Sequence, residues 1–344
     1  MTRYEIRGAT PEDEEPLLGL ARNLNTVNLP DDREHVRRLL LHSAKSFAGD
    51  MAPKLRKYVF VLWDLETRTA AGTSMIVAQL GRRGAPYIYF DVLGEEKYAA
   101  SVDKHFHQTL LRIGFSYDGP TEIGGLVVAP EYRKAPERLG LLISYVRFLF
   151  IAAHRSLFRD QLLAELLPPL EADGTSHLWE AVGRHFTDMS YREADLLSSE
   201  NKDFVRDLFP RDAIYVTLLA RDAQNVIGQV GAQTKGVEKM LRRVGFEYAD
   251  RVDPFDGGPH FIAATDTVVP VIGTRSLPLG EPSPSSASER GARCLVARDV
   301  AGAPFFRAIE SRGVIVDGSL RLPAESASEL AVAAGDAVYF LPLP

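Results

Sequence analysis

The spacing of hydrophobic positions predicts short strands and helices that alternate along the first part of the chain. Hydrophobic and polar residues alternate at Tyr4–Arg7, as in a strand. Thr10 and Pro11 then open a helix that runs to about Asn25, because a hydroxyl cap and a proline at the first helical position favour helix initiation. Arg33–Ala48 has the period of a second amphipathic helix. Three strands are expected next, at residues 57–64, 70–79 and 86–92, and the first two form a hairpin.

The middle of the chain contains a strand, a basic loop and a helix in direct succession, within residues 122–154. Ile123–Val128 is a short apolar strand, and the loop after it carries Arg133, Lys134 and Arg138. Gly140 then begins a helix that is apolar almost all round. A buried strand that leads into a helix N-terminus can bind an anion, because free N–H groups and the helix dipole both point at the loop. An ordinary strand–loop–helix of any α/β core has the same pattern, so both interpretations stay open here.

The pattern is weaker on both sides of this segment, so the predictions there are coarser. Residues 94–119, which precede the segment, are polar with mixed periodicity and predict no regular element. Residues 161–167 form either a strand or a short helix, which Pro168 ends. Helices are expected at 176–186 and 202–208, a strand at 214–220, and an amphipathic helix at 234–244 that Gly245 ends.

The composition changes near residue 274. Residues 274–290 are rich in Pro, Ser and Gly without periodicity, which is typical of a linker. Residues 291–344 contain short strands at regular spacing with turn signals. The sequence therefore predicts an α/β core of mixed sheet with flanking helices at 1–273, the linker, and a small β-barrel-like domain at 291–344.

Composition and charge narrow the functional classes. The chain has 344 residues and a net charge of −6, with dispersed basic residues, which argues against nucleic-acid binding. The single cysteine, Cys294, excludes an intramolecular disulfide framework and a multi-cysteine zinc site, so we expect a reducing, cytoplasmic location. The N-terminus has no signal-peptide pattern, and the longest apolar run, Leu139–Ala153, is interrupted by Ser144 and Arg147 and too short to span a bilayer. His105 and His107 are two residues apart, so they could share a strand face but not a helix face. We expect no metal there and no permanently bound cofactor.

Two motifs in order favour an acyltransferase. The strand–basic loop–helix is followed later by MLRRVGFEY, a helix that ends in Gly and Phe. This order resembles the Gcn5-related N-acyltransferases, in which the last strands splay apart and an acyl thioester lies against free backbone N–H groups. Such groups stabilise the oxyanion that develops in acyl transfer. On this interpretation Leu126, Val127 and Val128 contribute backbone atoms.

A narrower resemblance covers the chain nearly end to end. The chain resembles the arginine N-succinyltransferase family in the blocks KYVFVLWDLETRTAAGTS, TEIGGLVVAPEYRK, RFLFIAAHRSLF, LWEAVGRHFTDMSYREAD, FPRDAIYVTLLARDAQNVIGQV and FDGGP. The resemblance implies a Gcn5-related core, succinyl-CoA as donor, L-arginine as acceptor, and association with the same or a similar chain. It also implies a contact to succinyl-CoA from Leu126. The strand, the basic loop and the helix start add Val127, Val128, Arg133, Lys134 and Gly140 as candidates for CoA binding.

The chain departs from this family at three places. Gly231 stands where the family has the histidine taken as proton donor, and glycine has no titratable group. The loop at 135–140 is two residues longer than the family's Gly-x-Gly loop. FDGGP is followed by His260, Phe261 and Ile262 instead of Thr-Leu-Glu, so that a carboxylate is missing.

Other side chains are candidates for the roles left open. His260, Tyr215 and Tyr248 are candidate proton donors, although a surface histidine or a packing tyrosine is the simpler interpretation of each. Candidate partners of the substrate guanidinium are the carboxylates Glu122, Glu165, Asp253 and Asp256, since a guanidinium prefers a bidentate carboxylate. Two other functions stay open: an acyltransferase of changed acceptor or donor, and a non-catalytic or regulatory partner of a similar chain.

Overall fold

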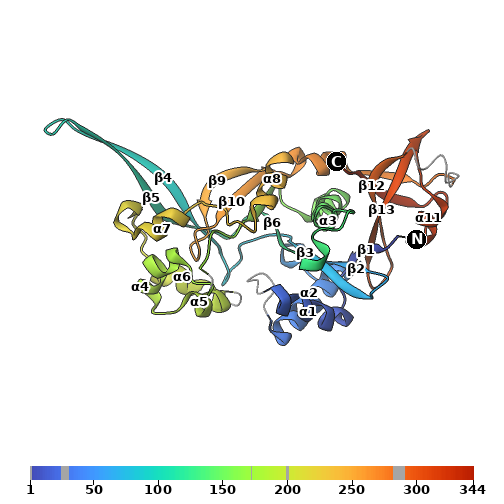
Figure 1. Cartoon of the computed structure of the whole chain (residues 1–344), viewed down its shortest axis with the longest axis horizontal. Coiled ribbons are helices and arrows are strands. Elements are labelled where there is room, and N and C mark those ends of the chain that lie inside the picture. Colours follow the sequence, from blue (N-terminus) through green and yellow to red (C-terminus); the bar gives the residue numbers. More distant parts are fainter. Residues whose placement is uncertain (1, 25–30, 172, 199–200, 282–290) are drawn as a thin grey trace. The chain divides into compact units, whose positions relative to one another are not determined.

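A computed structural model describes residues 2–24, 31–171, 173–198, 201–281 and 291–344 (Figure 1). The chain divides into two compact units, each built from segments that are distant in the sequence. Unit 1 comprises residues 1–78, 121–160 and 265–344, and unit 2 comprises residues 79–120 and 161–264.

Unit 1 contains an open antiparallel sheet. Its strands are β1 (Tyr4–Gly8), β2 (Lys57–Asp64), β3 (Thr69–Val77), β6 (Thr121–Val128), β11 (Arg275–Pro278), β12 (Ala292–Asp299), β13 (Phe306–Val316), β14 (Ser319–Arg321) and β15 (Ala337–Pro342). Across the sheet their order is β11-β15-β12-β13-β1-β2-β3-β6, and β14 pairs with β13. The first strand of the chain therefore lies in the interior of the sheet.

Caps encoded in the sequence mark the start of α1 (Glu14–Leu24) and both ends of α2 (Arg33–Ala48) in unit 1. The other described helices of this unit are α3 (Leu139–Ala153), α9 (Val269–Gly273) and α11 (Ala324–Leu330), with 3₁₀ turns at Pro11–Asp13, Pro53–Leu55, Pro130–Tyr132, Arg155–Leu157 and Thr265–Thr267. The Asp32 carboxylate caps α2 by accepting a hydrogen bond from His35 N, and Gly49 ends the helix with a φ of +83°. Thr10 and Asp13 form a capping box at the turn before α1. The two N-terminal helices predicted from the sequence are confirmed.

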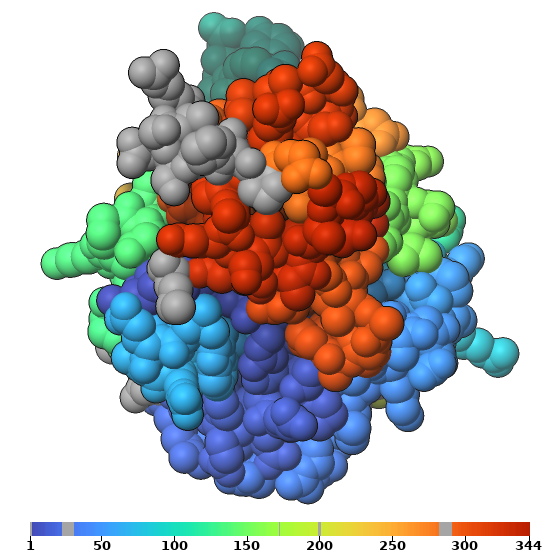
Figure 2. All heavy atoms as spheres, turned by 90° about the vertical axis from the view of Figure 1, so that its right-hand side faces the viewer, coloured from blue at the N-terminus to red at the C-terminus, as the bar shows by residue number. Residues whose placement is uncertain are grey.

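The C-terminal strands continue the sheet of unit 1. β13 pairs with β1 through Glu5 and Ile309, and Figure 2 shows C-terminal residues directly beside N-terminal ones. The expected separate β-barrel-like domain is not confirmed, because these strands belong to the sheet of unit 1, which is open at β11. Of the expected linker, residues 275–278 form β11 and residues 282–290 lie outside the described residues. The division at residues 273 and 291 stays a prediction about which parts of the chain fold independently.

Unit 2 contains a second antiparallel sheet and a group of short helices. Its strands, in their order across the sheet, are β7 (Gln161–Glu165), β10 (Pro259–Ala264), β9 (Glu247–Val252), β4 (Tyr87–Ala99), β5 (Lys104–Ser116) and β8 (Ile214–Tyr215). Its helices are α4 (Arg184–Thr187), α5 (Tyr191–Ser198), α6 (Asp203–Leu208), α7 (Arg221–Val226) and α8 (Lys235–Arg243), with a π-helical turn at Trp179–Gly183 and a 3₁₀ turn at Val216–Leu218. The core of this unit gathers around Trp179, whose ring stacks on Phe255 with centroids 5.1 Å apart.

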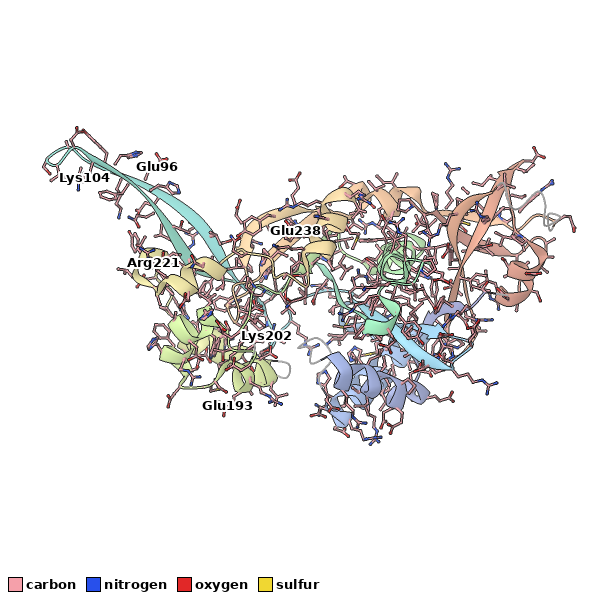
Figure 3. All side chains as sticks on the ribbon, in the orientation of Figure 1. Glu96, Lys104, Glu193, Lys202, Arg221 and Glu238 are labelled. Carbon is pink, nitrogen blue, oxygen red and sulfur yellow. The ribbon has the colours of Figure 1, made fainter. Side chains whose placement is uncertain are left out.

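Strands β4 and β5 form a long hairpin, which we call the arm. The sequence predicted only a strand at 86–92 and no element at 94–119. The strands pair in register from Tyr87 with Ser116 to Ala99 with Lys104. Glu96 and Lys104 lie near the outer end of the arm (Figure 3). Residues 96–99 and 104–107 are exposed, so neither face of this part carries the hydrophobic alternation that marks a half-buried strand.

Two other predictions are refined by unit 2. Residues 161–167 adopt the strand alternative, as β7. The expected strand at 214–220 is wrong beyond Tyr215, because the chain turns into a 3₁₀ helix there. Of the helices in the described part of the chain, none has both the length and the hydrophobicity that a membrane crossing requires.

Candidate functional site

The predicted donor-binding strand, β6, is interrupted by a bulge. Thr73 of β3 pairs with Val127, whereas Met75 pairs with Gly124, so that β6 has one residue more than β3 in this interval. Gly125 has a φ of +56°, and a Cβ there would lie 3.0 Å from Met75 Cγ. The backbone of Gly125 and Leu126, which we call the β6 bulge, is therefore left outside the β3 ladder.

The basic loop leads from β6 into the N-terminus of α3. Arg133 Nε donates a hydrogen bond to Val128 O over 2.9 Å, and Lys134 is exposed. Arg138, in the left-handed region at a φ of +58°, is the N-cap residue of α3, and none of the described side chains caps this helix. A Cβ at Gly140 would meet only Val128 Cγ2, at 3.9 Å, so no protein neighbour requires glycine there. The first turn of α3 thus offers free N–H groups beside positive side chains.

His260 of β10 is the centre of a polar cluster in unit 2. Its ring is fully buried, with Nδ1 2.8 Å from the Tyr87 hydroxyl and Nε2 3.5 Å from Glu165 Oε1. Side-chain atoms of Glu165, Asp253 and His260 lie within 4.8 Å of one another, a spacing that can hold a cation. Burial, and then the charges of Arg251 and Lys202, lower the pKa of His260 to about 3. The imidazole is therefore neutral at neutral pH, and His260 is not the surface residue of the simpler interpretation.

Carboxylates gather beside this cluster. Asp253 Oδ1 accepts a hydrogen bond from Phe255 N over 2.7 Å, and Asp256 Oδ1 accepts one from Gly258 N over 2.7 Å. Burial raises the pKa of both carboxyl groups, while the charge of Lys202 lowers that of Asp253. Burial and the charge of Asp253 raise the pKa of Asp195 to about 6. Asp256 is buried, and Asp253 and Asp195 are partly buried. Carboxyl groups in such surroundings favour either a proton or a bound cation.

The two candidate tyrosines have different surroundings. The Tyr215 hydroxyl donates to Glu95 Oε2 over 2.8 Å and accepts from Lys97 Nζ over 2.8 Å, so it belongs to a network on the arm. The Tyr248 hydroxyl makes no hydrogen bond with the described residues, and a Cβ at Gly228 would lie 3.0 Å from it. Burial and the charge of Asp250 raise the pKa of Tyr248 to about 12, so this hydroxyl stays protonated at neutral pH. Of the two candidate tyrosines, Tyr248 is thus the one whose hydroxyl is not engaged by the described residues, and it packs against Gly228.

Gly231 is held tightly against the chain after β7. Its N–H donates to Leu167 O over 2.9 Å, and a Cβ at this position would lie 2.7 Å from Pro168 O. The backbone would have to shift to accept any other residue. A histidine placed at Gly231 alone would meet the same carbonyl oxygen, so we do not expect that substitution to restore a proton donor.

We expect Gly231→Ala to lower the free energy of unfolding by about 2 kcal/mol, because the added methyl group overlaps a backbone oxygen. The matched control is Gly236→Ala in α8, where nothing lies within 4 Å of the added Cβ. The free energy of unfolding of this control should rise by about 0.5 kcal/mol, because alanine has a higher helix propensity than glycine. Urea unfolding of the three proteins measures both changes, and equal stabilities of the two variants would contradict the tight packing at Gly231.

The predicted site residues fall into two groups. Unit 1 holds Leu126, Val127, Val128, Arg133, Lys134, Gly140 and Glu122, and unit 2 holds His260, Tyr215, Tyr248, Glu165, Asp253 and Asp256. Sequence reasoning missed Tyr87, Asp195, Lys202 and Arg147, which join these groups only through the fold. No sequence signal links Tyr87 to His260, which lies 173 positions away.

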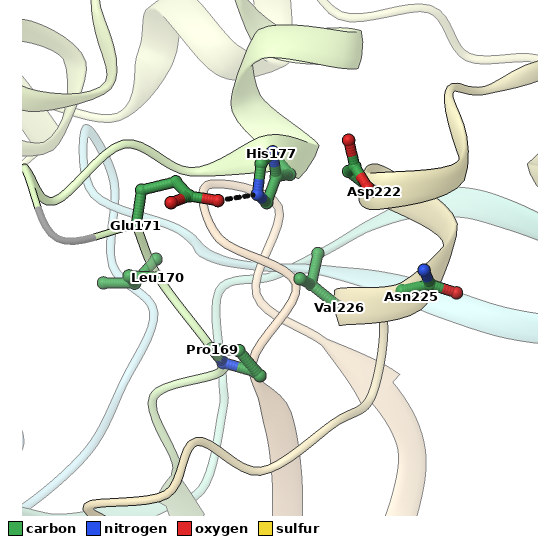
Figure 4. A pocket seen from close by; sticks show the side chains of 7 residues that line it. All are labelled: Pro169, Leu170, Glu171, His177, Asp222, Asn225 and Val226. Carbon is green, nitrogen blue, oxygen red and sulfur yellow. Dashed lines mark hydrogen bonds and ion pairs between the residues drawn. The ribbon is translucent and has the colours of Figure 1, made fainter.

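A shallow pocket in unit 2 lies apart from the predicted residues. Its lining consists of Pro169, Leu170, Glu171, His177, Asp222, Asn225 and Val226 (Figure 4). His177 Nε2 lies 2.7 Å from Glu171 Oε1 across its edge. No predicted donor or acceptor residue lines this pocket.

Comparisons with known proteins agree over nearly the whole chain. A family model described as "Arginine N-succinyltransferase beta subunit" matches residues 4–270. An arginine N-succinyltransferase of Yersinia pseudotuberculosis is 34% identical over 92% of this chain and 91% of its own length, and one of Escherichia coli is 32% identical over 98% and 97%. The solved structure of arginine/ornithine succinyltransferase subunit AI from Pseudomonas aeruginosa superimposes with a TM-score of 0.82, at 29% identity and with 99% of each chain covered. These matches support the predicted Gcn5-related α/β fold.

Proposed function

Because the chain belongs to the arginine N-succinyltransferase family, we propose that it transfers the succinyl group of succinyl-CoA to the α-amine of L-arginine. The relatives that carry this name match nearly their full length. The reaction forms an amide bond, breaks the thioester and releases CoA. It requires a donor site, a site for a cationic acceptor and groups that move protons.

The observation that carries the proposal is the β6 bulge followed by the uncapped N-terminus of α3. The CoA pyrophosphate would bind at the first turn of α3, near Gly140, with Arg133 and Lys134 beside it. The thioester carbonyl would lie against backbone N–H groups of Leu126–Val128. Donors fixed in this way stabilise the oxyanion of the tetrahedral intermediate without reorganisation.

The carboxylates of unit 2 are the proposed acceptor site. A guanidinium beside Glu165, Asp253 and Asp256 would supply the positive charge that these carboxyl groups otherwise take from a proton or from Lys202. Glu122 on β6 is the corresponding candidate in unit 1. The α-amine must lose a proton before it attacks, and the ionised carboxylates are the available bases.

The CoA thiolate must be protonated as it leaves. The family's histidine is taken to do this, and because Gly231 stands at its position, another group must take the role. His260 is a weak candidate, because a pKa of about 3 leaves almost no imidazolium at neutral pH. Tyr215 is engaged with Glu95 and Lys97. The Tyr248 hydroxyl packs against Gly228 and makes no hydrogen bond with the described residues, so we assign the proton donor to Tyr248.

Release of thiol from succinyl-CoA, followed with a thiol-reactive dye with and without L-arginine, tests the proposed function. We expect arginine-dependent release. Release with ornithine or another amine, but not with arginine, would mean a changed acceptor. Absence of succinyl-CoA binding would overturn the enzyme assignment.

A non-catalytic partner of a similar chain is the second candidate, and Gly231 favours it because the expected donor is absent there. This role requires tight CoA binding without thiol release in the same assay. Association with the same or a similar chain is part of the proposal in either case, since the matching family model describes a subunit. The expected cytoplasmic location and the expected absence of a metal or permanent cofactor stay predictions.

A further inference from the structure

Arg147 is a buried cation on α3 whose hydrogen-bond partners are all neutral. The side chain is 2% exposed. Its Nε donates to Ser144 O over 3.2 Å, Nη2 to Ser144 Oγ over 2.8 Å and Nη1 to Gly124 O over 3.3 Å. No ion pair within the described part of the chain includes it. Burial lowers the pKa of Arg147 to about 9, so the guanidinium is still charged at neutral pH.

Two partly buried arginines of unit 1, Arg7 and Arg293, have carboxylate partners, in contrast to Arg147. Arg7 binds Asp13 through both terminal nitrogens, and Arg293 binds Glu310. A buried charge without a counter-ion destabilises a fold, and an apolar residue of similar volume fills such a place at lower cost. The position of Arg147 is therefore poorly explained by stability alone.

The charge lies directly behind the proposed donor site. Gly124, whose carbonyl accepts from Nη1, is the residue before the left-handed Gly125 of the β6 bulge. The three hydrogen bonds use three of the five N–H groups of the guanidinium. A positive charge in a site of low dielectric attracts an anion more strongly than the same charge in water.

We infer that Arg147 determines donor specificity: its uncompensated charge behind the β6 bulge favours an acyl group that ends in a carboxylate over a neutral acyl group of the same length. This inference rests on the proposed function, because it takes the acyl chain to lie along β6. The guanidinium is held in place by Gly124 and Ser144, and the carboxylate of the donor completes its charge balance.

The test compares succinyl-CoA with butyryl-CoA, in which a methyl group replaces the carboxylate. We expect the unaltered protein to have a kcat/KM at least 100-fold higher with succinyl-CoA. Arg147→Met and Arg147→Gln should lower the value for succinyl-CoA about 30-fold and leave that for butyryl-CoA within a factor of three. Arg147→Lys, which keeps the charge, should retain most of the preference.

A parallel fall with both donors would mean that Arg147 only supports packing, and an unchanged ratio would mean that it does not sense the carboxylate. Either result overturns the inference. Arg147→Met removes the uncompensated charge, so we expect its thermal midpoint to lie at or above that of the unaltered protein. Such a midpoint shows that a loss of activity in this variant does not come from unfolding. If the unaltered protein shows no turnover, the proposed function fails independently of the inference about Arg147. The inference is then tested by equilibrium binding of the two CoA esters to the unaltered protein and to Arg147→Met. An equal loss of affinity for both esters, or no loss for either, refutes it.

Discussion

Replacing Tyr248 by phenylalanine is expected to lower kcat for arginine succinylation by about 100-fold or more, the usual contribution of a positioned proton donor. Burial and the charge of Asp250 raise the pKa of the Tyr248 hydroxyl to about 12, so it is protonated at neutral pH, as an ordinary tyrosine also is. Its removal leaves the CoA thiolate to find a proton from water. The ring of the variant keeps its place opposite Phe261, so its thermal midpoint should match that of the unaltered protein. Steady-state thiol release measures the effect.

Tyr215→Phe is the matched control for this substitution. The Tyr215 hydroxyl is engaged with Glu95 and Lys97, so its loss should change kcat by less than a factor of about three. A large loss in Tyr215→Phe with normal activity in Tyr248→Phe would reverse the assignment. Normal activity in both variants would return the role to His260 or to water.

Gly125→Ala is expected to lower turnover by about 100-fold, since a shift of about 1 Å in a positioning backbone can cost that much. Alanine is strained at the φ of +56°, and its Cβ would lie 3.0 Å from Met75 Cγ, so the β6 bulge must move. The free energy of unfolding should also fall by about 2 kcal/mol. Succinyl-CoA kinetics and urea unfolding measure the two effects.

Gly318→Ala separates backbone strain from the geometry of the β6 bulge. Gly318 lies in the turn between β13 and β14 with a φ of +77°, and nothing lies within 4 Å of an added Cβ. We expect Gly318→Ala to lower the free energy of unfolding by about 1 kcal/mol through backbone strain, without any loss of turnover. If both variants lose turnover equally, the activity follows stability and the β6 bulge has no special role.

Elements whose determinants are local were predictable from the sequence. The bounds of α2 follow from Asp32 and Gly49, which lie at its two ends. The arm was missed because its outer residues meet solvent on both faces and carry no period. The 3₁₀ turn after Tyr215 was missed because an apolar run of this length suits a strand equally well.

The candidate site was predictable only in part, for a different reason. The basic loop and β6 are contiguous in sequence, so their residues could be named together. Tyr87, Glu165 and His260 meet because three separate strands bring them together, and the glycine requirement at Gly231 comes from Pro168 O. Arg147 was visible in the sequence only as an interruption of an apolar run. Its significance depends on the absence of a carboxylate partner among the described residues around it.

The pairing of β1 with β13 has a consequence for biosynthesis. Tyr4–Gly8 leaves the ribosome long before Phe306–Val316, which is one of its two neighbouring strands. One edge of β1 must therefore wait unpaired until β13 has been made, and a long loop closes when the two strands pair. Contacts of such long sequence separation slow folding and prolong exposure of that edge to other chains. The C-terminal segment thus acts as the closing piece of unit 1, and a nascent chain without it presents an open strand to other chains or to a chaperone.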